Sequence, residues 1–274
     1  MMETIIVLAN DPGSSEKLYE AGCDDVVIAC RNHSLSAVHR SSVLPQNSSV
    51  LLNGYFFEED MEELRRIMTE LQNSTGMIYF ADPAVIAEAE KRGMTERLVY
   101  KPDTLAVSVP DVLWWMKRGI RSVLISPLVT LEELTEIGEQ CENCEAMVHG
   151  HLLMSASRRP LLSSRGLACD KRDYSLQEET RTERYPVYEG KEGTLIYTDY
   201  ILCSFREICA LKKHGIHRYF IDGSFLEQEE LCDIIRSYRA VLDGADPEMI
   251  IREFTEKYPG EPLSSGYYEE KTIK

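Results

Sequence analysis

Long apolar runs are missing from this chain of 274 residues. No stretch approaches the roughly 18 consecutive apolar residues that a membrane-spanning helix requires. The opening sequence METIIVLANDPGS has too short an apolar run for a secretory signal peptide, and it has no basic leader. We therefore expect a cytoplasmic protein that does not enter a membrane.

Basic residues are scarce beside acidic ones. The chain has 30 Lys and Arg against 46 Asp and Glu, which gives a net charge of −16. A surface of that sign repels nucleic acid and anionic membranes. Any role on nucleic acid therefore requires a local basic patch or a more basic partner.

Several catalytic and cofactor motifs do not occur. The chain has neither the GxSxG turn of serine hydrolases nor the HExxH helix of zinc peptidases. No glycine-rich nucleotide motif follows an apolar run, which disfavours a doubly wound dinucleotide-binding sheet. Cys141 and Cys144 form a single CxxC without a second pair or a histidine at zinc spacing. We expect the eight cysteines to be reduced thiols.

Short β-branched apolar runs alternate with amphipathic segments along most of the chain. The runs are continuous rather than alternating, as is typical of parallel strands buried on both faces. Helical segments between them carry start and stop signals, such as the capping box of Thr130 with Glu133 and the glycine at 119. We expect strands at 5–9, 26–29, 50–53, 77–80, 97–100, 122–126, 146–149, 194–198 and 218–222.

This alternation predicts an α/β fold, and the strand count favours a TIM-barrel-like (β/α)8 barrel with one additional strand. The odd strand at 194–198 follows a long polar stretch, so we expect an inserted hairpin over 170–198, between strands seven and eight. It is either a surface excursion or a lid or partner-docking hairpin. One domain should span 1–250, followed by a C-terminal tail over 251–274, which we expect to be loose from Tyr258 onward.

In a barrel, the residues that end each strand meet at one mouth. Asp222 could act there as a general acid or base if burial raises its pKa, or it could cap the next turn. His149, followed by a glycine that permits close approach, is either a structural histidine or part of a ligand site. Asn53 could orient a ligand or cap the next helix. The expected mouth residues are Asn10, Cys30 or Arg31, Asn53, Asp82, Lys101, Ser126, His149 and Asp222.

Positive charge gathers in the segment HGHLLMSASRRPLLSSRG, which begins at His149. Guanidinium groups bind carboxylates and phosphates in a bidentate manner. We expect Arg158, Arg159 and Arg165 to share a polar cavity with His149 and Asp222. Alternatively, these arginines pair with the surplus of nearby acidic residues for little energy.

The order and spacing of several motifs resemble the peptidase U32 family, which includes collagenase-like proteins and bacterial tRNA uridine-hydroxylation proteins. The resemblance covers about 1–245 and is to a short member of Gram-positive type. The motifs are AGCDDVVIA, VLLNGYFFEEDMEEL, YKPDTLAVSVPDVLWWMKRGI, EAMVHGHLLMSASRRPLLSS, ERYPVYEGKEGTLIYTDYILCSF, GIHRYFIDGSF and SYRAVLDG.

The resemblance implies a barrel-like α/β fold and one of two activities. One is a collagenase-like peptidase. The other, which we favour, is help in the oxygen-independent hydroxylation of a tRNA wobble uridine, with prephenate as the hydroxyl source. Short members tend to occur in pairs, so the implied partners are a second, longer family member, tRNA held through that partner, and a small dicarboxylate such as prephenate.

This chain departs from the family pattern in ways that bear on catalysis. Several members hold an iron–sulfur cluster on four cysteines, whereas only Cys169 lies near such a position here, so we expect no cluster and no metal. The family's lysine-isoleucine-glutamate-glycine is replaced by FIDG at 220–223, and Leu128 stands where an acid is common. A non-catalytic scaffold subunit is therefore a further alternative.

The sequence thus predicts an accessory hydroxylation factor, with a metal-independent peptidase and a scaffold as alternatives. A cysteine peptidase would require Cys30 or Cys169 to meet His149. Our candidate catalytic residues are His149 and Asp222, and our candidate substrate-binding residues are Arg158, Arg159, Arg165 and Asn53.

Overall fold

A computed structural model describes residues 2–180, 182–260 and 262–269. Eight parallel strands close into a barrel, because the last of them pairs with both the first and the seventh. This confirms the expected TIM-barrel-like fold. The barrel strands are β1 (Thr4–Leu8), β2 (Asp25–Ala29), β3 (Ser49–Leu52), β4 (Ile78–Phe80), β5 (Leu98–Tyr100), β6 (Ser122–Ile125), β7 (Cys144–Ser157) and β11 (Arg218–Asp222).

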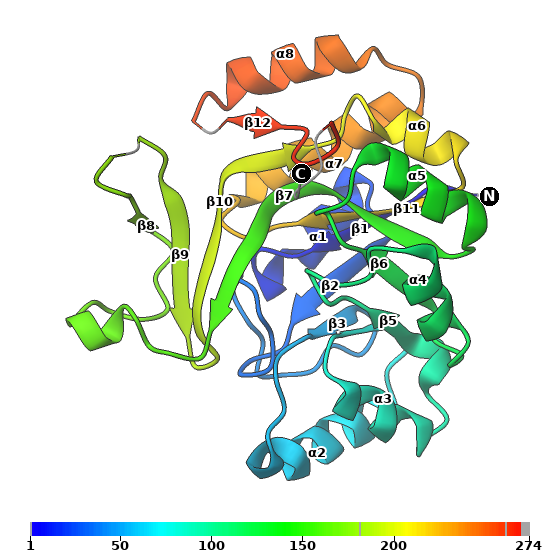
Figure 1. Ribbon diagram of the computed structural model, residues 1–274, viewed down its shortest axis with the longest axis vertical. Coiled ribbons are helices and arrows are strands. Elements are labelled where there is room, and N and C mark those ends of the chain that lie inside the picture. Colours follow the sequence, from blue (N-terminus) through cyan, green and yellow to red (C-terminus); the bar gives the residue numbers. More distant parts are fainter. Residues whose placement is uncertain (1, 181, 261, 270–274) are drawn as a thin grey trace.

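Helices surround the barrel, and Figure 1 shows α2 to α5 following one another around its outer side. Thr130 and Glu133 form the expected capping box at the start of α5. No helix in the described residues is long and apolar enough to cross a membrane. The helices are α1 (Ser15–Ala21), α2 (Met61–Leu71), α3 (Pro83–Glu90), α4 (Val109–Met116), α5 (Leu131–Gln140), α6 (Ile208–Lys213), α7 (Gln228–Leu242) and α8 (Pro247–Lys257), with short 3-10 helices η1 (Pro12–Ser14), η2 (Glu58–Asp60), η3 (Thr95–Arg97) and η4 (Ser163–Arg165).

The barrel interior is filled by alternate strand residues, while their neighbours in sequence pack against the helices. A buried ionic cluster closes its amino-terminal end. The Glu145 carboxylate accepts hydrogen bonds from Ser122 Oγ at 2.7 Å, Arg218 Nε at 2.8 Å and the Tyr79 hydroxyl at 3.1 Å. Because barrel enzymes carry their chemistry at the opposite end, we assign this cluster to stability.

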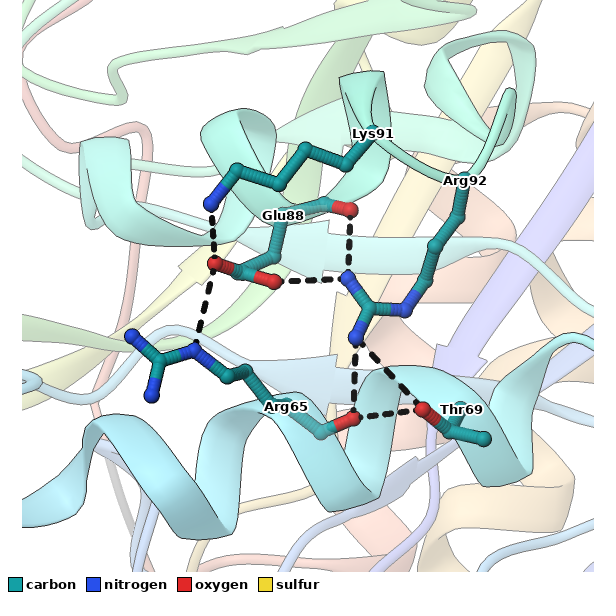
Figure 2. Close-up of polar contacts among 5 residues, drawn as sticks. All are labelled: Arg65, Thr69, Glu88, Lys91 and Arg92. Atoms are coloured by element: carbon teal, nitrogen blue, oxygen red, sulfur yellow. Dashed lines mark hydrogen bonds and ion pairs between the residues drawn. The ribbon is translucent and has the colours of Figure 1, made fainter.

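A second ionic cluster joins α2 to α3 on the outside of the barrel (Figure 2). The Glu88 carboxylate lies 2.6 Å from both Lys91 Nζ and Arg92 Nη1, and 3.7 Å from Arg65 Nε. Arg92 also donates to the Arg65 carbonyl at 3.2 Å and to Thr69 Oγ1 at 3.4 Å. The guanidinium of Arg92 therefore fastens one helix to the next.

Strand β7 continues beyond the barrel and forms an antiparallel sheet with three strands that project to one side (Figure 1). We call residues 152–200 the wing. The expected strand at 194–198 does lie outside the barrel, but the excursion begins within β7 rather than at 170. The wing contains the outer part of β7 together with β8 (Tyr174–Leu176), β9 (Tyr185–Gly190) and most of β10 (Gly193–Cys203).

The carboxyl-terminal segment is packed against the fold where it is described, which corrects the expectation that the tail is loose from Tyr258 onward. Helix α8 runs through the expected boundary, and the following strand β12 (Leu263–Ser264) pairs with β10. Tyr268 is buried, and its hydroxyl lies 3.1 Å from Ser204 Oγ. Residues 261 and 270–274 lie outside the described residues.

The loop after β2 replaces a crossover helix and closes the carboxyl-terminal mouth of the barrel. Residues 33–38, which we call the plug, are all buried. The backbone of Leu35 donates to Asn53 Oδ1 at 2.9 Å, and that of Ala37 donates to Ser224 Oγ at 3.3 Å. Val38 packs into the barrel interior. Leu35 and Ala37 also pack against wing residues, so the plug lies between barrel and wing.

Candidate functional site

Four polar side chains lie beneath the plug, where barrel strands β3, β5 and β11 end. We call Asn53, Lys101, Asp103 and Asp222 the mouth layer. The Lys101 ammonium forms an ion pair with Asp103, and Asn53 Nδ2 donates to Asp103 Oδ2 at 3.1 Å. Active sites of such barrels form from residues in this position. The mouth layer is therefore our candidate active site.

Asp222 has the electrostatic surroundings of a proton-transfer group. Burial raises the pKa of its carboxyl, although nearby Lys101 and hydrogen bonds from Ser224 act in the opposite direction. Its Oδ1 accepts the Ser224 backbone N–H at 2.8 Å, so Asp222 also holds the turn after β11. A raised pKa brings a carboxylic acid closer to neutral pH, where it can both take up and release a proton.

The mouth layer is covered rather than open. Asn53 is 0% exposed, Lys101 3% and Asp222 7%. Two open pockets of about 490 and 370 Å³ flank the plug, and they share Val38, His39 and Arg172 in their linings. The larger pocket reaches Gly223, directly after Asp222, so it approaches the mouth layer from the β11 side.

His149 faces the helix layer instead of the mouth. It is fully buried, and its ring lies 5.8 Å from those of Phe205 and Tyr238 and 6.0 Å from that of Phe254, centroid to centroid. Its Nδ1 lies 3.3 Å from the Tyr238 hydroxyl. The expectation that it shares a cavity with Asp222 is wrong, because the β7 backbone turns this side chain toward α7 and α8.

The glycine after His149 allows the close approach that the sequence suggested, but the approaching group is backbone. Gly150 has φ of +125°, and a Cβ there would lie 2.7 Å from the Asp222 carbonyl oxygen. A side chain at this position is excluded by both contact and conformation. Gly150 thus keeps β7 and β11 close where Asp222 enters the mouth layer.

The three arginines lie on the wing and do not join the mouth layer, which corrects the expected shared cavity. Arg158, Arg159 and Arg165 are exposed, and the Arg158 guanidinium lies 3.6 Å from the centre of the Phe57 ring. Arg158 lies nine positions after His149 along the chain, a span of up to roughly 30 Å at about 3.3 Å per residue. The cause is that β7 runs on past His149 and out of the barrel.

Asn53 has both ends of its amide engaged within the protein. Its oxygen accepts from the plug and its nitrogen donates to Asp103, and it does not cap the following helix. Lys101 was expected at the mouth but was not among the predicted site residues, and Asp103 was not predicted at all. The signal was present in the stretch YKPD, where a lysine that ends a buried strand is followed two residues later by a carboxylate.

The described cysteines do not fit a four-thiolate cluster. Cys169 is exposed on the wing. Cys203 is the last residue of β10 and pairs with His149 in the barrel part of β7. Cys141 and Cys144 lie at the amino-terminal end of β7. Among the described residues, no group of three or more His, Cys, Asp or Glu side chains is placed to hold a metal ion. That the protein works without a cluster remains a prediction.

The described residues also do not form the cysteine–histidine pair considered above. Cys30 ends the second barrel strand and Cys169 is exposed on the wing, so neither lies beside His149. Cys203 is the cross-strand partner of His149, but burial raises the pKa of its thiol to about 12. A thiol that stays protonated is a poor nucleophile.

Comparison with known proteins gives a family and three relatives. Residues 19–274 match the model of a family described as Peptidase family U32. The tRNA hydroxylation protein P2 of Bacillus subtilis (strain 168) is 26% identical over 206 residues, which cover 71% of this chain and 67% of that protein.

Two further matches are more limited in identity or coverage. The tRNA hydroxylation protein P of Escherichia coli (strain K12) is 29% identical over 133 residues, which cover 47% of this chain and 29% of that protein. Indole-3-glycerol phosphate synthase of Campylobacter hominis is 22% identical over 193 residues, which cover 70% of this chain and 66% of that protein.

Proposed function

The chain belongs to peptidase family U32, and we propose on that basis that it takes part in the hydroxylation of tRNA. The observation that carries this proposal is the similarity to tRNA hydroxylation protein P2 along 71% of the chain. In finer detail, we propose an oxygen-independent reaction at the wobble uridine, with prephenate as the hydroxyl source and a longer family member as partner.

The mouth layer supplies groups that suit such a reaction. Lys101 is a buried cation that could hold one carboxylate of a dicarboxylate such as prephenate, since buried ammonium groups bind anions strongly. Asp222, with its raised pKa, is placed to move a proton near that anion. The plug must shift for any substrate to reach these groups, so we propose that it opens during the reaction cycle.

The net charge bears on how tRNA would be held. At −16 the chain as a whole repels a polyphosphate, and only local patches on it can attract one. A partner that supplies most of the RNA-binding surface is consistent with this charge. We therefore propose that the chain contributes the mouth layer, while the partner contributes much of the affinity for tRNA.

Deleting the gene and measuring tRNA nucleosides by mass spectrometry tests the proposal. We expect hydroxylated wobble uridine to fall at least tenfold and to return when the wild-type chain is supplied. Asp222→Asn keeps the acceptor for the Ser224 N–H but cannot carry the proton, so we expect it to restore less than a tenth of the modification. Asp243→Asn, at an exposed carboxylate after α7, should restore it fully.

The outcomes separate the alternatives. An unchanged level of modification in the deletion strain would exclude the proposed function. If Asp222→Asn and Lys101→Met both restore the tRNA modification fully, the mouth layer carries out no chemistry and the chain acts as a scaffold. Hydrolysis of gelatin by the purified chain would support the peptidase alternative, which no contact among the described residues favours.

A further inference from the structure

A cleft of about 370 Å³ lies between the wing and the loop that contains the plug, and its lining is strongly basic. We call Arg31, His39, Arg172 and Lys191 the basic cleft. Two of these residues come from the loop after β2 and two from the wing. Its volume falls within the range of small-molecule sites.

The charge in this cleft is poorly compensated, although acidic residues outnumber basic ones by 46 to 30 in the whole chain. Arg31 and Lys191 form no ion pair with any residue that the structure describes, and neither does Arg172. The single carboxylate in the lining, Asp170, accepts a hydrogen bond from the Tyr188 hydroxyl at 2.8 Å. In a protein with surplus acid, unpaired cations gathered around a hollow point to a ligand that supplies the negative charge.

One guanidinium in the cleft is already held in place. Arg172 donates through Nε to the Ala37 carbonyl of the plug, and its guanidinium carbon lies 5.5 Å from the centre of the Tyr188 ring. Its Nη1 lies 3.4 Å from Nε2 of His39. A fixed planar guanidinium loses little entropy when it binds a planar or tetrahedral oxyanion.

Arg40 also lines the cleft, but its charge is neutralised within the protein. Arg40 forms an ion pair with Glu192, and both side chains are nearly buried. Its Nη2 also donates to the Ser36 carbonyl at 2.8 Å. Arg40 therefore fastens the wing to the plug, while Arg31, Arg172 and Lys191 keep their charge for a ligand.

We propose that the basic cleft binds an oxyanion, either a phosphate or a carboxylate, of a ligand whose remainder lies in the adjoining pocket of about 490 Å³. The two hollows share His39 and Arg172, and the lining of the larger one includes Gly223, the residue after Asp222. An anion held in the cleft thus directs the rest of its ligand toward the mouth layer. The choice of RNA or a small acid as the ligand rests on the proposed function. The prediction that the cleft binds an oxyanion does not.

Binding of two probes by the purified full-length chain tests this site. One probe is a fluorescein-labelled single-stranded RNA of seven nucleotides, followed by anisotropy, and the other is malonate, followed by calorimetry. We expect Arg31→Glu combined with Lys191→Glu to weaken binding of at least one probe tenfold or more. For RNA, the slope of log affinity against log salt should fall by about 1.4, since each single-strand phosphate contact contributes about 0.7.

A matched control separates local contacts from net charge. Lys117→Glu combined with Lys213→Glu changes the net charge equally, at exposed residues near the ends of α4 and α6. We expect less than a twofold effect from it. The milder Arg31→Gln with Lys191→Gln should weaken binding in the same direction, which guards against misfolding of the first variant.

Each outcome bears on the inference. Loss of RNA binding alone identifies a backbone phosphate as the ligand group, and loss of malonate binding alone identifies a small carboxylate. Equal effects of the cleft and control variants, or no binding of either probe by the wild-type chain, would overturn the proposal. The test is independent of tRNA modification in cells, so a cleft that binds anions would survive failure of the proposed function.

Discussion

At the residue scale, the surroundings of His149 determine which of its nitrogens carries the proton. The Tyr238 hydroxyl donates to the Val148 carbonyl at 2.6 Å and accepts the Ser204 N–H at 3.0 Å. With its proton committed, this hydroxyl can only accept from His149 Nδ1. Nδ1 therefore carries a proton, and Nε2 has no hydrogen-bond partner among the described residues.

We expect His149 to make stability depend on pH. Burial lowers the pKa of its ring to about 3, from about 6.5 in an unfolded chain. The contribution of neutral His149 to the free energy of unfolding is complete above pH 6.5. It is lost as the pH falls from 6.5 toward 3, because only the unfolded state then takes up the proton. The free energy of unfolding should lose up to about 1.4 kcal/mol per pH unit in that window.

Urea denaturation of the wild type and of His149→Leu between pH 4.5 and 7.5 measures this effect. The leucine variant should show the smaller loss of stability on acidification, whatever its stability at pH 7.5. Phe254→Leu, which changes the packing around the His149 ring but removes no titratable group, is the matched control and should keep the wild-type slope. Parallel pH profiles for the wild type and His149→Leu would contradict the assignment.

The sequence predicted part of the candidate site at this scale. Asp222 and Asn53 do lie at the mouth, because the end of a buried strand is visible as the last residue of an apolar run. The direction of His149 was not predictable, since a bulge between β7 and β11 shifts the register next to it. The sequence did not predict the basic cleft either, because the cleft brings together residues 31 and 172 through a loop that has no periodic pattern.

At the scale of elements, neighbouring helices are held by polar contacts as well as by their apolar faces. Helix α2 buries Leu64, Ile67, Met68 and Leu71, as its 3.6-residue pattern predicts. The Glu88 carboxylate of α3 is nearly buried beneath cationic side chains from both helices. Hydrogen bonds from Lys91 and Arg92 lower its pKa, which shows that the folded state favours the charged form.

We expect Glu88→Gln to destabilise the protein by about 1.5–3 kcal/mol at pH 7, the usual range for hydrogen bonds to charged groups. The contribution of Glu88 should be complete above the pH at which an unfolded glutamate titrates. It should be lost as pH falls through the lower pKa of the folded state. Chemical denaturation at pH 7 and at acid pH measures both effects.

Glu70→Gln is the matched control, because Glu70 forms an exposed ion pair with Arg66 on the same α2. We expect it to cost less than about 0.5 kcal/mol, as exposed pairs four residues apart contribute little. If Glu88→Gln and Glu70→Gln lower the free energy of unfolding equally, then burial does not strengthen the ionic contacts of Glu88.

Apart from the outer part of β7, which runs to Ser157 instead of ending at His149, the barrel strands were predicted to within one or two residues. Apolar runs bounded by polar residues identify buried parallel strands. The sequence did not predict the conformations of the wing and the plug. The wing strands are partly exposed, so their pattern does not differ from that of a surface loop. The plug satisfies its backbone through Asn53 and Ser224, which lie far away in sequence, and no local signal reveals such contacts.

At the scale of the whole molecule, the wing, the plug and the barrel form one continuous packing unit. Leu35 and Ala37 of the plug pack against Tyr188, Leu195 and Tyr197 of the wing. Arg40 and Glu192 add an ion pair across the same boundary. The position of the wing therefore determines how firmly the mouth is closed.

We expect Arg40→Met to loosen this boundary without unfolding the barrel. The change leaves the Glu192 carboxylate nearly buried without its cation, and breaking a buried pair typically costs about 3–5 kcal/mol. Amide hydrogen exchange should become faster over 33–38 and in β9 and β10, and stay unchanged in β3 to β5.

Arg66→Met, at an exposed ion pair on α2, is the control and should leave exchange in the plug unchanged. Uniformly faster exchange throughout the barrel would show that the pair stabilises the whole fold and not this boundary. Unchanged exchange over 33–38 would show that apolar packing alone holds the plug.

Because β7 is one uninterrupted strand through both the barrel wall and the wing, the projecting sheet is not a detachable module. A truncation that removed residues 154–196 would take away Tyr188 and Leu195 and so uncover Leu35 and Ala37 of the plug. Newly exposed apolar surface promotes aggregation. Engineering a minimal version of this protein therefore requires a replacement cover for the plug, and simple deletion will not produce one.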